Sequence, residues 1–115
     1  MRNIFVYGTL KKGYGNHRVM QNAEGVFVQE DTLQGYDIYD LGGIPGVIEG
    51  EGEVTGEVFS VSDEGLPYLD RLEGHPTFYK RSEATTLGGI PVEVYIIQRD
   101  MSRCTKLNGS WPKVA

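Results

Sequence analysis

Glycine is the residue that most constrains how this chain can fold. Sixteen of its 115 residues are glycine, and they occur along the whole length of the sequence. A glycine inside a helix or strand loses more backbone freedom on folding than any other residue, so this distribution predicts tight turns, bulges and strands rather than long helices. The length fits one hydrophobic core, and we expect a single domain over residues 1–115.

Apolar residues in short runs or in alternation predict several β-strands. The expected strands cover residues 3–7, 26–29, 33–41, 54–61, 78–87 and 90–99. The last two are separated by Gly88-Gly89, which is typical of a hairpin turn. Residues 42–52, with the sequence GGIPGVIEGEG, are rich in turn residues and are expected to form a loop.

One helix is well supported, at residues 63–74. Leu66, Leu69 and Glu73 are spaced i, i+3 and i+7, so they share one helix face. Gly74 follows them and is placed to end the helix in the left-handed conformation.

A second, shorter helix is expected to begin at Asn16, which would cap it, and to end near residue 22. The polar tail from residue 101 onward gives no clear strand or helix pattern. Many strands with few and short helices predict an α+β fold built on an antiparallel or mixed, barrel-like sheet.

Charge and cysteine content exclude several classes of protein. The net charge is −5 and no basic cluster is larger than Lys11-Lys12, so no nucleic-acid partner is expected. Cys104 is the single cysteine, which allows no internal disulfide and suits a reducing compartment. The sequence has no long apolar run and no signal-peptide pattern, so we expect no membrane span and a cytoplasmic location.

The stretch FVYGTLKKGYG at residues 5–15 raises the first functional question. A continuous apolar strand ends abruptly at Gly8 and Thr9, which exposes backbone N–H groups at its tip. Gly8 and Gly13 are spaced as in a phosphate loop, but that motif needs Lys and Ser/Thr where Tyr14 and the next glycine stand. From the residues alone, a tight structural turn is the favoured interpretation, and a ligand-binding loop is the alternative.

Glu73 raises the second question, because it lies on or beside the apolar face at the C-terminal end of its helix. The helix dipole opposes a negative charge there, and partial burial would raise the pKa further. A raised pKa is what a general base and acid near neutral pH requires. On periodicity alone, however, an ordinary last-turn residue that faces solvent is the favoured interpretation.

Other reactive side chains give weaker signals. His17 and His75 have no metal-ligand partners at the usual spacings, so no metal site is expected. Cys104 lies in the polar tail and is not expected to be a catalytic thiol. Arg81 is expected to pair with a carboxylate, either at the functional site or as a salt bridge at the sheet edge.

Two of these stretches combine into a resemblance. The sequence VYGTLKKG at residues 6–13, followed by Asn16, resembles the opening signature of the gamma-glutamylcyclotransferase-like family, which includes gamma-glutamylamine cyclotransferases and AIG2-like proteins. The sequence LDRLEG at residues 69–74, followed by Tyr79 and Arg81 in FYKR, resembles its second signature.

The resemblance also includes GEVFSV at residues 56–61 and covers roughly residues 4–99. It implies an α+β fold, with a small mixed, mainly antiparallel β-barrel and a few flanking helices. It further implies a cavity in which the glycine loop faces the glutamate at the helix end.

The function that the resemblance implies is enzymatic, of the lyase or acyltransferase type: 5-oxoproline and a free amine are released from a gamma-glutamyl amine or peptide. The catalytic glutamate of the family matches Glu73, which would act as general acid and base while the substrate's alpha-amine attacks its own gamma-carbonyl. The positions that match the substrate-binding loop are Tyr7, Gly8, Thr9 and Leu10.

The partner implied is a small gamma-glutamyl molecule, and the implied reaction needs no metal and no cofactor. The alternative is a non-catalytic small-ligand or interaction module that retains the signatures for packing, because a fold does not fix a function.

Overall fold

The computed structural model describes residues 1–112, so the expected domain of residues 1–115 extends three residues beyond the described part. The elements run in the order β1 (Arg2–Val6), α1 (His17–Asn22), β2 (Val26–Asp40), β3 (Pro45–Val61), α2 (Leu66–Glu73), β4 (Tyr79–Thr85), β5 (Pro91–Ile97) and β6 (Thr105–Lys106).

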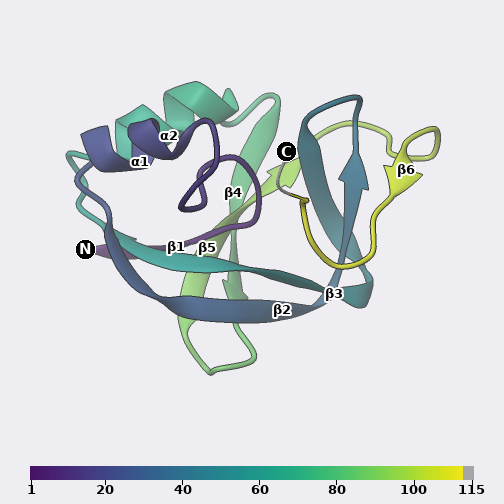
Figure 1. Cartoon of the computed structure of the whole chain (residues 1–115), viewed down its shortest axis with the longest axis horizontal. Coiled ribbons are helices and arrows are strands. Elements are labelled where there is room, and N and C mark those ends of the chain that lie inside the picture. The colour runs from purple at the N-terminus through teal and green to yellow at the C-terminus, as the bar shows by residue number, and fades with distance from the viewer. Residues whose placement is uncertain (113–115) are drawn as a thin grey trace.

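The six strands form one sheet in the order β4-β5-β1-β3-β2-β6, which curls into a half-barrel (Figure 1). Within residues 1–112, β1 and β5 pair in parallel and every other strand pairing is antiparallel. The turn between β4 and β5 reaches across to β2, where the Leu87 N–H donates to the Thr32 carbonyl at 2.8 Å. The predicted α+β class with a mixed, mainly antiparallel, barrel-like sheet is confirmed.

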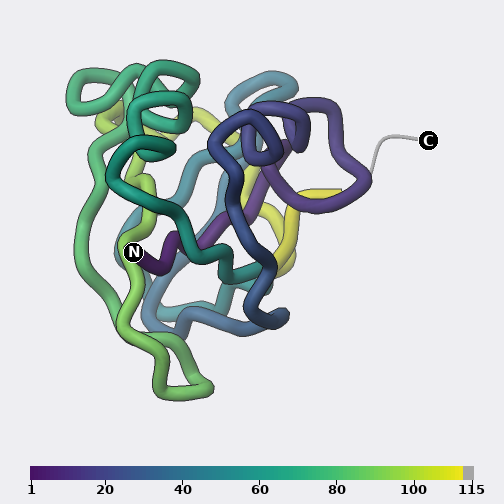
Figure 2. Tube along the Cα trace, turned by 90° about the vertical axis from the view of Figure 1, so that its left-hand side faces the viewer, coloured from purple at the N-terminus to yellow at the C-terminus, as the bar shows by residue number. Residues whose placement is uncertain are grey.

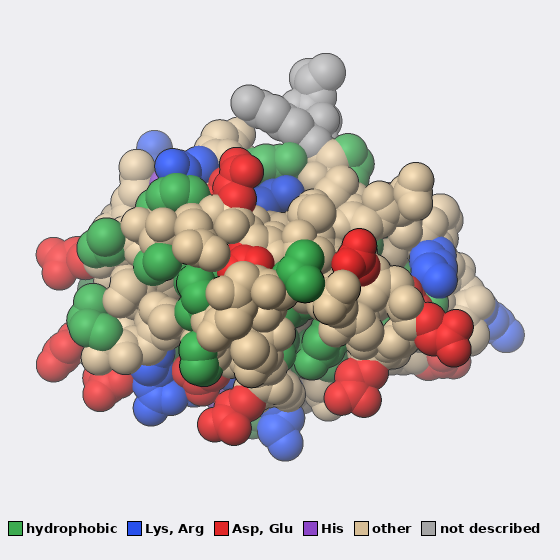
Figure 3. Space-filling view, turned by 90° about the horizontal axis from the view of Figure 1, so that it is seen from below, with side chains coloured by type: hydrophobic (Ala, Val, Ile, Leu, Met, Phe, Trp, Pro, Cys, Tyr) green, Lys and Arg blue, Asp and Glu red, His purple; other side chains and the backbone are tan. Residues whose placement is uncertain are grey.

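The two helices lie together at one end of the half-barrel, and the β4–β5 turn lies at the opposite end (Figures 1 and 2). Seen from the face away from the helices, hydrophobic side chains are interspersed with acidic and basic ones (Figure 3).

Strands β2 and β3 form one long hairpin, which corrects two predictions. Residues 26–29 and 33–41 belong to a single strand, and most of the expected loop at residues 42–52 is the first part of β3. Gly50 and Gly52 do not form a turn; they let the side chain of Asp37 lie close to the backbone of β3. A Cβ atom at Gly50 would lie 2.0 Å from a carboxylate oxygen of Asp37. The Gly52 N–H donates to the same carboxylate at 3.0 Å.

The true turn of this hairpin is short. The carboxylate of Asp40 accepts the N–H groups of Gly42 and Gly43 at 2.8 and 2.7 Å, and both glycines have positive φ. This turn places Ile44 and Pro45 next to the end of β1, where they contribute to the cavity described below.

Both expected helices are present, but their ends differ from the predictions. Helix α2 begins at Leu66 rather than residue 63, and Gly74 ends it with φ 64° and ψ 37°, as expected for a left-handed cap. Helix α1 begins after Asn16, but the expected side-chain cap is wrong. The Asn16 side chain instead donates to the Thr9 hydroxyl at 2.8 Å.

The tail is part of the fold, which the sequence pattern did not reveal. Strand β6 pairs with β2, and the Leu107 N–H donates to the Ile38 carbonyl at 2.8 Å. Trp111 is only 6% exposed and packs in an apolar cluster with residues of β1, β2, β3 and β5. The Lys11 ammonium group and the Tyr14 hydroxyl both donate to its carbonyl, at 3.5 and 3.1 Å.

Candidate active site

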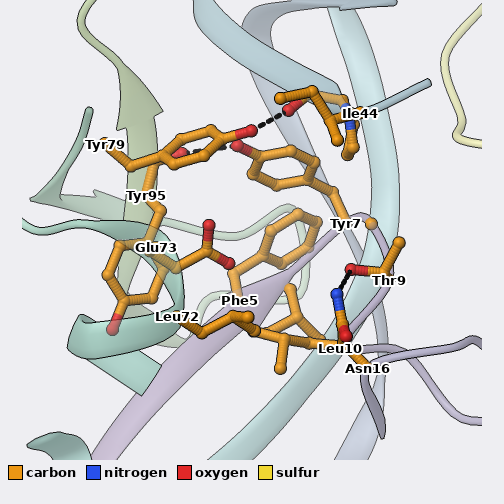
Figure 4. A pocket seen from close by; sticks show the side chains of 13 residues that line it. Phe5, Tyr7, Thr9, Leu10, Asn16, Ile44, Leu72, Glu73, Tyr79 and Tyr95 are labelled. Carbon is orange, nitrogen blue, oxygen red and sulfur yellow. Dashed lines mark hydrogen bonds between the residues drawn. The ribbon is translucent and has the colours of Figure 1, made fainter. Parts of the chain in front are cut away.

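A cavity of about 180 Å³ lies where the end of β1, the loop that follows it and the end of α2 meet. The five residues that the sequence predicted for the site, Tyr7, Gly8, Thr9, Leu10 and Glu73, all line it. Residues far apart in the sequence therefore face one small space, as Figure 4 shows for ten labelled side chains.

The loop after β1 contributes backbone N–H groups. The carbonyls of Gly8, Thr9 and Leu10 are occupied: they accept from Lys11 N–H, Asn16 N–H and the His17 ring at 3.1, 3.0 and 2.9 Å. The N–H groups of the same three residues have no acceptor within residues 1–112. Successive backbone N–H groups in a turn are the kind of group that can bind an anion.

Gly8 is required by packing against the start of β3. A Cβ atom at this position would lie 2.5 Å from the Pro45 ring, closer than real Cβ contacts. The strand must therefore break at a glycine for the loop to pass the start of β3. This contact supplies a structural reason for Gly8 that the sequence pattern did not show.

Glu73 is the last residue of α2, which is anchored by the buried Leu66 and Leu69. Its side chain is half-buried and points into the cavity, toward the space beside Phe5 (Figure 4). The interpretation of a solvent-facing residue is therefore wrong. Its carboxyl group forms no hydrogen bond with the residues that the structure describes, and burial raises its pKa from 4.5 to about 7.

Three tyrosines form an aromatic wall, and each hydroxyl group is held by the protein. Tyr7 donates to the Tyr95 carbonyl at 2.7 Å, and Tyr79 donates to the Pro45 carbonyl. Tyr95 donates to Asp70 at 2.7 Å. Burial raises the pKa of all three phenols, so they stay neutral. Glu73 is thus the group lining the cavity whose protonation changes near neutral pH.

Asp70 lies one helical turn before Glu73 and has the opposite environment. Arg81 donates to both of its oxygens, at 2.8 and 3.1 Å, and a further nitrogen of Arg81 donates to Glu93 at 2.9 Å. Although partial burial opposes ionisation, the hydrogen bonds from Arg81 and Tyr95 lower the pKa of Asp70. The two carboxyl groups on α2 therefore differ: Asp70 is paired and ionised, whereas Glu73 is unpaired within the described residues and titrates near pH 7.

The predicted carboxylate pairing of Arg81 is confirmed, and the pairing holds α2 against β4 and β5 rather than neutralising Glu73. His75 accepts the backbone N–H of Arg81 at 3.2 Å, which gives it a structural role. Within residues 1–112, no group of three or more His, Cys, Asp or Glu side chains is arranged to hold a metal ion. The described helices include none that is long and apolar enough to cross a membrane.

Several lining residues were missed by sequence reasoning. Asn16 and Tyr79 lie within or beside the quoted motifs, so their positions in the sequence could have indicated that they line the cavity. Ile44 and Pro45 gave none, because they fell in a segment expected to be a loop and reach the cavity only through the β2–β3 hairpin. Tyr95 lies on a strand that the sequence did predict. It lines the cavity because β5 pairs with β1, and the sequence did not predict that pairing.

Comparison with known proteins identifies a family and a shared fold. The model of the family described as gamma-glutamyl cyclotransferase, AIG2-like, matches residues 4–113. An Escherichia coli protein named gamma-glutamylcyclotransferase family protein YtfP is 33% identical over 109 residues, which are 94% of each chain. A Rattus norvegicus protein named gamma-glutamylaminecyclotransferase is 36% identical over 91 residues, 71% of this chain and 61% of the rat protein.

Among solved structures, the crystal structure of an AIG2-like protein from Mus musculus matches with a TM-score of 0.87 at 27% identity. The match covers 97% of this chain and 88% of the mouse chain.

Proposed function

The chain belongs to the gamma-glutamyl cyclotransferase, AIG2-like family, and from this membership we propose that it is an enzyme that converts a gamma-glutamyl amine or peptide into 5-oxoproline and a free amine. One observation carries the proposal. An unpaired carboxyl group with a pKa of about 7, that of Glu73, shares a small cavity with a loop whose N–H groups have no acceptor in the described chain.

The loop is proposed to bind the alpha-carboxylate of the glutamyl group. The N–H groups of Gly8, Thr9 and Leu10 would donate to its oxygens, because a row of unpaired backbone N–H groups favours an anion. Tyr7 would contribute its ring as a wall, since its hydroxyl group is already bonded to Tyr95. This binding mode leaves the alpha-amine and the gamma-carbonyl facing the helix end.

Glu73 is proposed to carry the protons. The alpha-amine of a free substrate is an ammonium group near neutral pH, and Glu73 would remove a proton so that the nitrogen can attack the gamma-carbonyl carbon. A new C–N bond closes the ring, and the bond to the leaving nitrogen breaks after that nitrogen receives the first proton from Glu73. The ring nitrogen then gives its second proton to Glu73, which passes it to the released amine. Overall the alpha-nitrogen passes from three hydrogens to one and the leaving nitrogen from one to three, so the protons balance.

Orientation would supply much of the rate. Amine and carbonyl belong to the same molecule, and a cavity of this size can hold the glutamyl chain folded so that the two groups meet. Intramolecular reactions with a well-oriented geometry gain several kcal/mol over the bimolecular reaction, up to roughly 7–11 kcal/mol in the best cases. The neutral tyrosine wall adds no charge that would compete with Glu73.

We propose the cytoplasm as the compartment of the enzyme. Cys104 is the one cysteine of the sequence, so the chain has no internal disulfide that an oxidising compartment would favour.

The proposal is tested by incubating the protein with a set of gamma-glutamyl amines and peptides and measuring 5-oxoproline by mass spectrometry. We expect 5-oxoproline and the matching amine in equal amounts from at least one compound, and none above background with Glu73→Gln under the same conditions. Tight binding of a gamma-glutamyl compound without any product would instead support the non-catalytic ligand-binding module.

A further inference from the structure

A row of ion pairs runs from α2 across three strands of the sheet. The Asp70 carboxylate on α2 accepts from Arg81 on β4 through both oxygens, at 2.8 and 3.1 Å. Arg81 also donates to Glu93 on β5 at 2.9 Å, and Glu93 accepts from Arg2 on β1 at 3.2 Å. Arg2 further contacts Asp63, whose side chain is 76% exposed, so that water screens its charge. The first four side chains carry two positive and two negative charges, which cancel.

The Asp70 end of this row lies against the wall of the cavity. Tyr95, which lines the cavity together with Glu73, donates its hydroxyl hydrogen to Asp70 at 2.7 Å (Figure 4). Asp70 precedes Glu73 by three residues on α2, and Cβ atoms at that spacing lie about 5–6 Å apart. The side chains of Asp70 and Arg81 are both mostly buried, so solvent screens their charges less than it screens charges on the surface.

Few other titratable groups face Glu73. Among the described residues, the others that line the cavity are tyrosines from β1, β4 and β5: Tyr7, Tyr79 and Tyr95. Their phenols are neutral, because burial raises the pKa of each. Helix α1 packs against α2 but contributes no titratable lining residue, and His75 after α2 contacts the Arg81 N–H and the Tyr95 ring outside the cavity lining.

The charge on Asp70 would oppose the ionisation of Glu73 if nothing cancelled it. A like charge at this separation disfavours the charged form of a carboxyl group and raises its pKa. Burial is the cause of the raised pKa of Glu73, and no charge of a described neighbour adds to it. The Arg81 guanidinium, bound to both oxygens of Asp70, supplies the opposite charge.

We propose that Asp70 and Arg81 are positioning residues for the reaction, and that Arg81 sets the pH range in which Glu73 accepts a proton by cancelling the charge of Asp70. The pair holds α2 against β4 and β5 and keeps Tyr95 in the cavity wall, yet leaves no net charge beside Glu73. The inference rests on the proposed function for the role of Glu73 as a base, whereas its electrostatic part can be measured without substrate.

The test is an NMR titration of the Glu73 carboxyl group, on the full chain labelled with ¹³C at the glutamate side-chain carboxyl carbons. The signal of Glu73 is identified by its absence from Glu73→Gln. Arg81→Gln leaves the charge of Asp70 without its guanidinium partner, so the titration midpoint should rise by at least about half a pH unit. Asp70→Asn leaves an excess positive charge, and the midpoint should fall by a similar amount. The double variant should return close to the wild-type midpoint.

Two controls separate charge from structure. Arg81→Lys keeps the positive charge but loses the bidentate contact, so it should lower stability and leave the midpoint near the wild-type value. Arg71→Gln removes an exposed positive charge from the same helix, two residues before Glu73. Side chains at that spacing do not face each other and solvent screens an exposed charge, so the midpoint should not change.

The rising part of the pH profile of kcat/KM should move with the NMR midpoint in each variant, which a purely structural role would not produce. Midpoints that move in opposite directions in Arg81→Gln and Asp70→Asn support the inference. Unchanged midpoints, or a change in the same direction in both variants, overturn it even if 5-oxoproline is formed. Should one of these variants fail to fold, the direction of the change in the other decides. Midpoints that move as expected without any 5-oxoproline from gamma-glutamyl compounds support the electrostatic inference and reject the proposed function.

Discussion

Replacing Glu73 by glutamine should stabilise the fold at alkaline pH and change its stability little at pH 5. In the folded chain burial raises the pKa of this carboxyl group from 4.5 to about 7, so between these values the folded state binds more protons than the unfolded state. Stability must then fall as the pH rises through this window, and the full penalty is present above pH 7. Glutamine resembles the protonated, neutral carboxyl group and avoids that penalty.

The size of the effect follows from the pKa change. Raising a carboxyl pKa from 4.5 to about 7 corresponds to about 3 kcal/mol of lost stability once the group is ionised. For a chain of this length, that difference corresponds to a change of about 10 °C in the unfolding temperature. We expect the melting temperature of Glu73→Gln to exceed that of the wild-type protein at pH 8, and the difference to be several times smaller at pH 5.

The assay is thermal or urea unfolding of both proteins from pH 5 to pH 8.5. Glu64→Gln is the matched control, because its side chain is exposed just before α2, and it should keep the wild-type pH dependence. A stability difference between Glu73→Gln and wild type that is equal at pH 5 and pH 8 would show that Glu73 is not held in a desolvated position, and the reasoning from burial would be refuted.

Three other substitutions test the structure around the site. Arg81→Gln should lower stability by about 1.5–3 kcal/mol, and a double-mutant cycle with Asp70→Asn in urea unfolding should show coupling; additive losses would mean that the two side chains do not interact. Gly8→Ala should lower the free energy of unfolding by about 1–3 kcal/mol, because the new Cβ atom meets Pro45, and it should weaken gamma-glutamyl binding in calorimetry. If stability and affinity are both unchanged, Gly8 is not in close contact with Pro45. Trp111→Ala should lower stability by about 3 kcal/mol or more in urea unfolding, and a loss below 0.5 kcal/mol would show that the tail is not packed on the sheet.

Local signals in the sequence were enough to predict two structural features of the candidate site. The spacing of Leu66, Leu69 and Glu73, followed by Gly74, predicted a helix whose last residue lies at the edge of its apolar face, and the structure has that helix end. The expected rise in the pKa of Glu73 also follows from this position. The abrupt end of the apolar run at Gly8 predicted a loop with exposed N–H groups, and the hydrogen-bond pattern of the loop has that form.

Contacts between distant segments could not be predicted in the same way. The glycines in residues 42–52 look like turn residues, but Gly50 and Gly52 are required by the carboxylate of Asp37 across the hairpin. Ile44 enters the cavity only because that hairpin has its true turn at residues 41–44. Trp111 looked like part of a polar tail, and its burial depends on strands that the tail itself does not contain.

The most direct test of the account is the pH dependence of kcat/KM for wild type and Glu73→Gln, measured as 5-oxoproline formed from the gamma-glutamyl amide that the wild-type protein turns over best. Because the ionised carboxylate must accept the first proton, wild-type kcat/KM should rise with pH and level off above a pKa of about 7. Glu73→Gln should lose about 10²–10⁴-fold in kcat, bind the amide within a few-fold of the wild-type affinity, and show no such rise. A variant that keeps full activity, or a variant with the same rise near pH 7 as the wild type, would contradict the claim that Glu73 carries the protons.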